Sequence, residues 1–306
     1  MEELESLGAC PVCSNHEVTS TIPRSVGLTV SLCAGCGLAY LDPRPTWSSM
    51  LRHYEQGYAF LPLSQQWADA EAFEMLSEDA RRIERLKPLR GTTVMDVGCG
   101  PGLMLATLRR RGSTRIFGIE PSQDAASFAE RMLRGATILR TTWEAADRDL
   151  GRAEFDVITG LDLIEHLYEP RAFVRWSRAR LAPGGVLYLK TPNWAAATRY
   201  GASWHGLAED FEHVCYFDRA SLIRLLEDEG LMVQAVAYEP ARAGLGGGGV
   251  PQPREGGGAR RLRAGVRTIP GLNHVAYEGL QRVRRHRKRS DIAAGTADVL
   301  VMLASR

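Results

Sequence analysis

Four of the six cysteines form two pairs near the amino terminus. Each pair has the spacing CxxC, and 19 residues separate the pairs. Two such turns bring four thiolates together as the tetrahedral sulfur set that Zn²⁺ prefers, and this set leaves no open position for a substrate. We therefore predict a zinc ribbon with a structural metal. The ligands are Cys10, Cys13, Cys33 and Cys36.

Three other uses of these cysteines remain as alternatives: a catalytic metal, a thioredoxin-like redox pair and a disulfide framework. A redox pair needs only one CxxC, and a disulfide framework needs an oxidising compartment. The chain starts with the acidic stretch MEELESLGAC, whereas a secretory signal has a basic start followed by an apolar stretch. We expect a cytoplasmic protein.

A second chemical motif is the glycine-rich stretch VMDVGCGPG at 94–102, where an apolar run leads into Gly98, Gly100 and Gly102. Glycines at such a turn let a ligand approach the backbone. Asp96 lies at the end of the predicted strand, and Glu120 follows Gly100 by 20 residues, where an acid can accept both hydroxyls of a ribose. The spacing GxGxG and the acidic Asp96 disfavour a pyrophosphate. They favour a nucleoside that carries a cationic amino-acid portion.

This motif, with FDVITGLDLIEHLYEP at 155–170 and LAPGGVLYLKTPN at 181–193, resembles the class I S-adenosylmethionine-dependent methyltransferases. The resemblance covers about residues 92–239 and implies S-adenosylmethionine as the cofactor. It implies that Asp96 and the loop glycines hold the methionine portion, that Glu120 holds the ribose and that Trp143 lies on the adenine, with core packing as the alternative for Trp143. Leu161 and Asp162 fall at the end of the fourth strand, where open α/β sheets bind ligands.

The ribbon ahead of this core is similar to bacterial enzymes that tailor natural products, sugars and cell-surface glycans, and the EHL motif resembles the ubiquinone-type O-methyltransferases. The resemblance implies methyl transfer to a hydroxyl of a sugar, glycan or secondary metabolite. A hydroxyl acceptor needs a base, for which histidine is suited near neutral pH. We expect His213 or His166 in this role; a structural role is the alternative for each.

Other readings of the function stay open. Asp162, Glu165 and His166 match positions linked to a divalent cation in ubiquinone-type relatives, so Mg²⁺ is a minor alternative. Methylation of carbon or nitrogen, including in RNA, is the rival reaction. A non-catalytic zinc-ribbon module on a methyltransferase scaffold is the rival outside enzymes. Cys99 occupies the variable position of the glycine loop and lacks an obvious base or metal partner, which favours packing over chemistry.

The predicted elements place these residues on an α/β fold. Short β-rich runs at 92–97, 115–120, 136–141, 155–160, 185–190, 232–239 and 297–304 alternate with helical stretches, one of which is predicted at 219–229. This alternation indicates a Rossmann-like sheet, seven-stranded and with an antiparallel last strand by the family resemblance. We divide the chain into a ribbon at 1–45, a helical linker or lid at 46–91 and a methyltransferase core at 92–306. The linker carries an amphipathic helix at 65–87, and its Tyr54 and Tyr58 are candidates for covering the cofactor.

Composition limits the partners. The 306 residues have a net charge of only +2, which disfavours a dedicated nucleic-acid binder, and they contain no apolar run long enough to span a membrane. A Gly- and Arg-rich insertion of 57 residues, 240–296, contains RVRRHRKR at 282–289. Its ordinary interpretation is a solvated segment, and contact with an anionic substrate, a membrane surface or nucleic acid is the alternative. We expect a small-molecule or glycan acceptor, and the sequence gives no oligomeric state.

Overall fold

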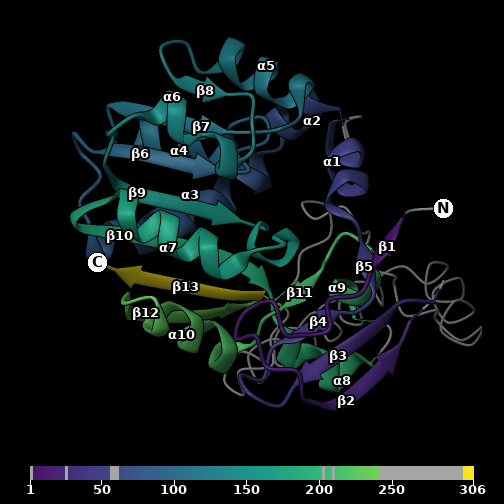
Figure 1. Cartoon of the computed structure of the whole chain (residues 1–306). Helices are drawn as coiled ribbons and strands as arrows, with labels where there is room; N and C mark the ends of the chain where they lie inside the picture. The colour runs from purple at the N-terminus through teal and green to yellow at the C-terminus, as the bar shows by residue number, and fades with distance from the viewer. Residues whose placement is uncertain (1–2, 25–26, 56–61, 202–203, 209–210, 241–298) are drawn as a thin grey trace, which may run out of the picture.

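The computed structural model describes residues 3–24, 27–55, 62–201, 204–208, 211–240 and 299–306 (Figure 1). The predicted insertion at 240–296 therefore lies, apart from residue 240, outside the described residues, as does Tyr58. None of the described helices is long and apolar enough to cross a membrane.

A seven-stranded sheet forms the centre of the core, as predicted. Its order is β12-β13-β10-β9-β6-β7-β8; β13 runs antiparallel to both of its neighbours, β12 and β10, and the other pairs in this sheet are parallel. The strands are β6 (Thr93–Val97), β7 (Arg115–Ile119), β8 (Thr137–Leu139), β9 (Phe155–Leu161), β10 (Leu181–Pro192), β12 (Met232–Glu239) and β13 (Val299–Ser305). The α/β, Rossmann-like fold class is confirmed.

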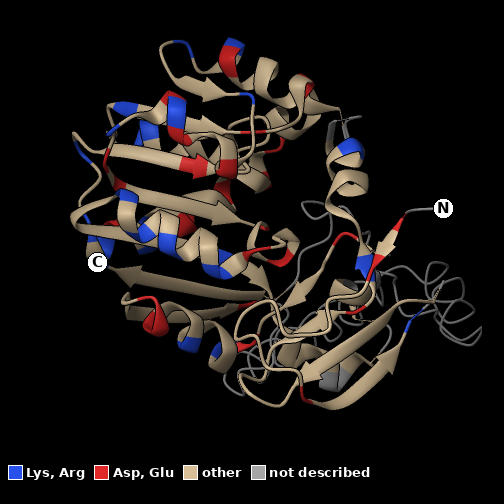
Figure 2. Ribbon diagram, in the orientation of Figure 1, with Lys and Arg blue, Asp and Glu red and all other residues tan. Residues whose placement is uncertain are grey.

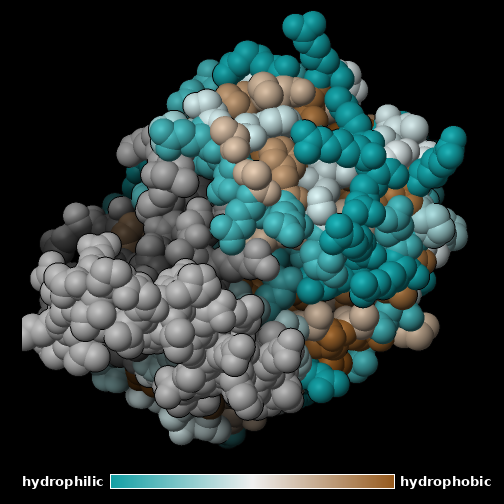
Figure 3. Space-filling model, turned by 180° about the vertical axis from the view of Figure 1, so that it is seen from behind, coloured by the Kyte–Doolittle hydropathy of each residue, from teal (hydrophilic) through white to brown (hydrophobic). Residues whose placement is uncertain are grey.

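Helices cover both faces of this sheet and enclose two clusters of buried apolar side chains. One face carries α3 (Ala70–Leu86), α4 (Leu103–Arg110) and α5 (Gln123–Met132), and the other carries α6 (Asp147–Leu150), α7 (Pro170–Arg180) and α10 (Arg219–Asp228). Figure 2 shows basic residues along α7 and both basic and acidic residues on α10. Seen from behind, the exposed face is mostly hydrophilic with small apolar patches (Figure 3).

The predicted single helix at 65–87 is wrong in one respect, because two helices occupy this stretch. α2 (Leu63–Ala68) ends at Asp69, and α3 begins at Ala70. The Asp69 carboxylate accepts hydrogen bonds from the backbone N–H groups of Glu71 (2.9 Å) and Ala72 (3.1 Å), and this cap fixes the start of a new helix. The predicted helix at 219–229 is confirmed as α10, which starts at a capping box between Asp218 and Ser221.

The amino-terminal sheet has a strand that the sequence did not predict. Its order is β11-β4-β3-β2, from β2 (Val18–Pro23), β3 (Thr29–Cys33), β4 (Ala39–Leu41) and β11 (Cys215–Tyr216). The strand β11 belongs to the segment between β10 and α10, so the core completes the sheet of the ribbon. A separate ladder pairs β1 (Leu4–Glu5) with β5 (Arg44–Pro45), and α1 (Trp47–Glu55) follows. The four-stranded sheet of the ribbon lies beside the carboxyl ends of the parallel strands of the large sheet (Figure 1).

The remaining short elements follow strands of the large sheet. They are η2 (Trp143–Ala145), η3 (Ile164–His166), η4 (Trp194–Ala196), α8 (Ala197–Tyr200) and α9 (His205–Ala208). η3 comes after β9, and η4, α8 and α9 come after β10, so both groups belong to the end of the sheet where ligands bind in this architecture.

Candidate active site

The glycine loop joins β6 to α4 in the conformation that its sequence requires. Gly98, Gly100 and Gly102 all have positive φ, of 71°, 51° and 85°. A Cβ added at Gly102 would lie 2.6 Å from Leu133 Cδ1, so this glycine lets α4 pack on α5. A Cβ added at Gly100 would meet no atom within 4 Å. The loop therefore presents bare backbone toward open space at its middle, which is where a ligand can approach.

Two buried carboxyl groups flank this loop. Asp96 lies on β6 and accepts a hydrogen bond of 2.6 Å from the Thr159 hydroxyl on β9. Burial raises the pKa of Asp96 to about 7, the hydrogen bond from Thr159 opposes this rise and the charge of Glu120 adds to it. A cationic ligand group beside Asp96 would favour its ionised form.

Glu120 ties the next strand to the glycine loop. One carboxylate oxygen accepts the backbone N–H of Gly100 and the other accepts that of Ser122, both at 2.8 Å. Burial raises the pKa of Glu120, and these two donors lower it. A carboxylate has about four acceptor positions, so Glu120 keeps capacity for the hydroxyls of a ribose. The open loop and the pair of acids fit the methionine and ribose portions of S-adenosylmethionine.

The other residues predicted to bind the cofactor lie at or after the ends of β8 and β9, the strands next to β7 and β6. Trp143 is buried, packs edge-on against Phe173 at a centroid distance of 5.6 Å and lies 5.7 Å from Trp176. Its indole N–H has no hydrogen-bond acceptor in the described part of the chain. Leu161 ends β9 half-buried, and Asp162 follows it, exposed, with a φ of 49°. Contact of these three residues with a cofactor stays a prediction.

Cys99 lies within the loop but packs into the core. It is buried, and a Cβ added at Gly118 would lie 2.7 Å from its sulfur. Burial raises the pKa of the Cys99 thiol well above its usual value, and the charges of Asp96 and Glu120 add to this effect. The thiol is therefore kept neutral, in agreement with packing.

The two candidate bases lie next to each other. The rings of His166 and His213 cross at 76° with centroids 4.7 Å apart. His166 Nδ1 donates to the carbonyl oxygen of Glu212 (3.1 Å), and His213 Nδ1 donates to that of Gly206 (3.1 Å). A carbonyl can only accept, so each imidazole carries a proton on Nδ1, and in its neutral form the lone pair is then on Nε2. Burial, followed by the neighbouring His213, lowers the pKa of His166 well below its usual value.

Glu165 joins this pair of histidines. It is fully buried, and its Oε2 accepts the hydroxyl of Thr191 at 2.9 Å, while its Oε1 has no hydrogen-bond donor among the described residues. Burial, followed by the charge of Asp162, raises its pKa to about 8, and His213 opposes this rise. One side-chain ligand atom from each of Glu165, His166 and His213 lies within 4.8 Å of the others. The predicted cation ligand Asp162 is not part of this cluster.

The linker helices contact both the histidine pair and the glycine loop. On α1, the hydroxyl of Tyr54 lies 3.2 Å from His166 Nδ1 and His53 pairs with Glu212 at 2.9 Å. On α2, the indole of Trp67 donates to the carbonyl oxygen of Pro101 at 2.7 Å, at the glycine loop. Tyr54 was a candidate from the sequence, whereas His53, Trp67 and Glu212 were not. Their contacts join positions at least 34 residues apart, and no local pattern marks them.

The four predicted zinc ligands meet at the base of the ribbon. Ligand atoms of all four cysteines lie within 4.8 Å of one another, and the sulfurs of Cys10 and Cys36 are 3.6 Å apart and those of Cys13 and Cys33 are 3.4 Å apart. In a tetrahedron with Zn–S bonds of about 2.3 Å, neighbouring sulfurs are about 3.8 Å apart. The backbone N–H of Gly35 also points to Cys33 Sγ at 3.3 Å. The donor set and its spacing thus fit a structural zinc ion.

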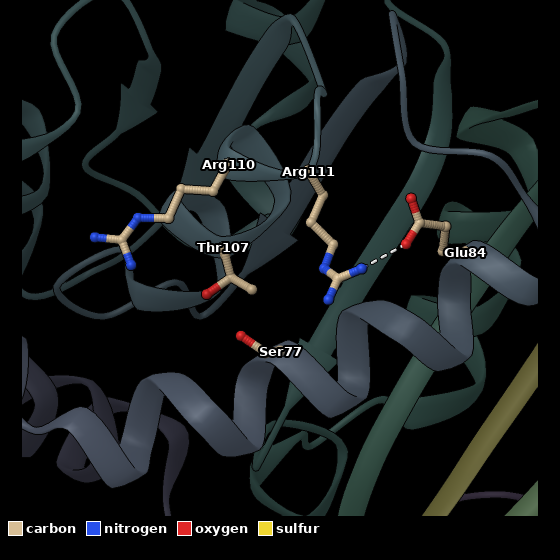
Figure 4. Close-up of a pocket in the computed structure, with 5 residues that line it drawn as sticks. All are labelled: Ser77, Glu84, Thr107, Arg110 and Arg111. Atoms are coloured by element: carbon tan, nitrogen blue, oxygen red, sulfur yellow. Dashed lines mark hydrogen bonds and ion pairs between the residues drawn. The ribbon is translucent and has the colours of Figure 1, made fainter.

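A groove of about 380 Å³ lies between α3 and α4, away from the candidate active site and from the cysteine cluster (Figure 4). Its lining residues are Ser77, Glu84, Thr107, Arg110 and Arg111. Arg111 pairs with Glu84 at 2.6 Å, and the hydroxyls of Ser77 and Thr107 donate to carbonyls of their own helices. The polar groups of these four residues are thus committed to contacts within and between the two helices, and the guanidinium of Arg110 lies over the ring of Phe73.

Relatives in sequence are methyltransferases. A family described as methyltransferase domain matches residues 57–236. The ubiquinone biosynthesis O-methyltransferase of Escherichia coli O9:H4 (strain HS) is 28% identical over 177 residues, which cover 53% of this chain and 68% of that protein. Its counterpart in Escherichia coli O7:K1 (strain IAI39 / ExPEC) is 29% identical over 167 residues, with 49% and 64% covered. The chain spans about two thirds of the length of these relatives.

Solved structures agree in fold. An S-adenosylmethionine-dependent methyltransferase from Mesorhizobium loti has a TM-score of 0.50 at 14% identity, covering 76% of this chain and all of that one. A chain from the complex of the Haloferax volcanii Trm112 methyltransferase activator with a methyltransferase has a TM-score of 0.51 at 16% identity, covering 77% and 91%. With the glycine loop and its two acids in place and the family match extending over more than half of the sequence, this chain belongs to the S-adenosylmethionine-dependent methyltransferases.

Proposed function

We propose that the enzyme transfers a methyl group from S-adenosylmethionine to a hydroxyl group of a sugar, a glycan or a secondary metabolite. The observation that supports this most directly is the pair of adjacent histidines, both held with Nδ1 protonated. A hydroxyl is a poor nucleophile until its proton is removed, and a neutral imidazole with a lone pair on Nε2 can remove it. The 28–29% identity with O-methyltransferases also supports oxygen as the acceptor atom.

Two neighbouring groups of residues have separate roles: one binds the cofactor, and the other activates the acceptor. S-adenosylmethionine, when bound, supplies an activated methyl group, so the protein has to align the acceptor and exclude water. Asp96, the glycine loop and Glu120 bind and orient the cofactor. Either His213 or His166 takes the acceptor proton at Nε2, and the low pKa of His166 keeps that ring neutral. Tyr54 and Trp67, from the linker helices, cover the two regions.

The buried carboxyl of Glu165 supports a second way to activate a hydroxyl. A divalent cation held by Glu165, His166 and His213 would give Oε1 of Glu165 a partner and would lower the pKa of a bound hydroxyl. Imidazole and carboxylate together suit Mn²⁺ better than Mg²⁺, which prefers oxygen ligands alone. Chelation separates the two routes: loss of turnover on removal of divalent ions, with the zinc content unchanged, supports the cation, and full turnover supports a histidine base.

A panel of acceptors tests the proposed reaction. Zinc-loaded protein is incubated with methyl-labelled S-adenosylmethionine and with monosaccharides, nucleotide-linked sugars, catechol, a primary amine or an RNA transcript. We expect an O-methyl product from a sugar or phenol, identified by its carbon chemical shift, and no product with Glu120→Ala. Labelling of carbon, of nitrogen or of RNA would overturn the hydroxyl assignment. Tight cofactor binding without transfer to any hydroxyl would favour a non-catalytic scaffold.

The proposal also includes a reducing compartment for the enzyme and Zn²⁺ as the metal of the ribbon. Six free cysteines, four of them gathered at one point, suit a reducing compartment such as the cytoplasm, where thiolates stay available to Zn²⁺. We place the reaction there. Contact of the Arg-rich segment at 282–289 with a membrane surface stays a prediction, because this segment lies outside the described residues.

A further inference from the structure

A loop of the core carries His213, and the amino-terminal ribbon holds this loop at both ends. Arg24, which follows β2, donates from Nη1 to the hydroxyl of Tyr216 at 2.8 Å and from Nη2 to the carbonyl oxygen of Leu207. Leu207 precedes His213 and Tyr216 follows it. One guanidinium of the ribbon thus joins the two sides of the loop.

The upstream contact lies next to the group that sets the state of the histidine. His213 Nδ1 donates to the carbonyl oxygen of Gly206, and the next carbonyl along the chain is the one that Arg24 holds. The orientation of these two peptide groups decides whether a carbonyl faces Nδ1. If the carbonyl turns away, the proton is free to move to Nε2, and the lone pair needed for catalysis is lost from that atom.

The downstream contact is reinforced by the backbone. The N–H of Leu41 on β4 donates to the carbonyl oxygen of Val214 (3.0 Å), and the N–H of Val214 donates to that of Glu165 (2.9 Å). Next along the chain, Cys215 pairs with Tyr40 and Tyr216 pairs with Ala39. The residue after His213 therefore bridges the ribbon and the turn that carries His166, so Arg24 acts on a loop whose far side is already fixed.

We propose that Arg24 is a positioning residue of the methyltransferase site, through which the ribbon holds His213 with its proton on Nδ1. The planar guanidinium donates in two fixed directions and can hold two acceptors together, whereas the lysine ammonium is a single point with no such geometry. The catalytic consequence rests on the proposed function, in which His213 or its neighbour His166 is the base. The structural consequence, a defined tautomer of His213, does not.

The test reads the tautomer directly. Protein labelled with ¹⁵N-histidine is compared by long-range ¹H–¹⁵N correlation for wild type, Arg24→Ala, Arg24→Lys and Arg224→Ala. Arg224 is the matched control, because it also joins core to ribbon, through the carbonyl oxygen of Gly35 at 2.5 Å, but lies on α10 rather than on the loop. Binding of S-adenosylhomocysteine by calorimetry checks that each variant keeps an intact cofactor site.

We expect Arg24→Ala to show both tautomers of His213 and at least tenfold faster amide exchange at Leu207, with unchanged affinity for S-adenosylhomocysteine. Arg24→Lys should be intermediate, and Arg224→Ala should match wild type. With an accepted hydroxyl substrate, kcat should fall about tenfold in Arg24→Ala while KM for the cofactor stays constant. If Arg24→Ala fails to fold, Tyr216→Phe removes only one of the two acceptors and should shift the tautomer in the same direction.

Two results would overturn the proposal. The first is that His213 has the same tautomer in Arg24→Ala as in wild type. If Arg24→Ala does not fold, the same result in Tyr216→Phe overturns the proposal. The other is an equal change in Arg224→Ala, which would mean that docking of the ribbon as a whole, rather than Arg24, controls the loop. Failure of the proposed function is seen separately, as the absence of O-methyl product with an unaltered tautomer in the wild-type protein.

Discussion

Asp96 lies buried at the end of β6, where its carboxyl group accepts a hydrogen bond from the hydroxyl of Thr159. Its pKa of about 7 is above the value of about 3.9 in an unfolded chain, so the folded state holds the proton more tightly. The stability that this group contributes is complete below about pH 4 and is lost as the pH rises through 7. At pH 8 the cofactor-free protein carries an ionised carboxylate that is poorly solvated.

We therefore expect Asp96→Asn to raise the free energy of unfolding of the cofactor-free protein at pH 8 by on the order of 1 kcal/mol, and by less at pH 5. The same change should weaken binding of S-adenosylmethionine. Urea unfolding at the two pH values, with calorimetry for the cofactor, measures both effects. A variant that is less stable than wild type at pH 8 would contradict this account.

Asp156 provides the control of opposite sign. Burial alone would raise its pKa, but the N–H of Thr93 and the ammonium of Lys87 hold the pKa below its usual value. Its stabilising contribution is present at neutral pH and is lost as the pH falls through its low pKa. Asp156→Asn should thus lower stability at pH 8.

The histidine pair gives the second prediction at this scale. His213→Ala should reduce turnover by roughly 10²- to 10⁴-fold, the usual contribution of a general base, while the affinity for S-adenosylmethionine stays near that of wild type. His16→Ala serves as control, because His16 lies on the exposed amino-terminal segment and contacts the carbonyl oxygen of Gly8. Initial rates with a hydroxyl acceptor measure the effect. Equal turnover in wild type and His213→Ala would defeat the assignment.

Much of the chemistry at residue scale could be predicted because it depends on short spacings. The two CxxC pairs and the loop from Asp96 to Gly102 each lie within one turn, so residue types alone restrict their conformation. The adjacency of His166 and His213 could not be predicted, because it depends on how the segment after β10 returns across the end of the sheet. The same holds for the cluster of Glu165, His166 and His213, in which His213 takes the place expected for Asp162.

At the scale of elements, a buried charge network fixes α3 to the sheet. Asp79 is fully buried on α3 and accepts hydrogen bonds from Tyr188 (2.5 Å), Lys190 (3.0 Å) and Arg82 (3.0 Å). Glu239 on β12 completes the network by pairing with Lys190 at 2.7 Å and with Arg82. The linker that carries α1 and α2 is thereby anchored to the core through its last helix.

Removal of the central acid should be costly, because it leaves Lys190 and Arg82 with one carboxylate between them. We expect Asp79→Ala to lower the free energy of unfolding by about 3–5 kcal/mol. Glu78→Ala, one residue earlier, removes the exposed partner of Arg81 and should change it by less than about 1 kcal/mol. Urea unfolding compares the two variants, and similar losses in both would contradict a role for the buried network.

The seven-stranded sheet and α10 could be predicted because each has a strong local pattern of apolar residues or caps. The break between α2 and α3 could not, because the apolar spacing continues across Asp69 while the side chain of Asp69 caps a new helix. Strand β11 has only two residues, and it exists because β4 offers an edge to pair with. Edge pairing between distant segments leaves no trace in local periodicity.

At the scale of the whole molecule, the sheet of the ribbon continues into the segment of the core that carries His213. Its sheet ends in a strand of the core, and its buried side chains belong to the same cluster as those under α7 and α10. A zinc ion on the four cysteines would hold β3 and β4, and through them the loop that carries His213. The metal would then support the acceptor side of the site without contacting it.

Removal of the zinc should therefore affect the two sides of the site differently. After treatment with a strong chelator under reducing conditions, we expect amide exchange to accelerate at least tenfold at Leu41 and Tyr216 and to stay slow at Val94 on β6. Cys36→Ser should behave like the chelated protein, whereas Cys99→Ser should keep one zinc per chain. Metal analysis with hydrogen-exchange mass spectrometry measures this, and unchanged exchange at Tyr216 after complete loss of zinc would refute the coupling.

The central claim is that cofactor binding and acceptor activation reside in two adjoining groups of residues, one around Glu120 and one around His213. Calorimetric titration of the zinc-loaded protein with S-adenosylmethionine tests it most directly, on wild type, Glu120→Ala and His213→Ala. We predict micromolar binding to wild type and to His213→Ala, and none to Glu120→Ala. Binding that survives Glu120→Ala, or that is lost in His213→Ala, would contradict this division of the site.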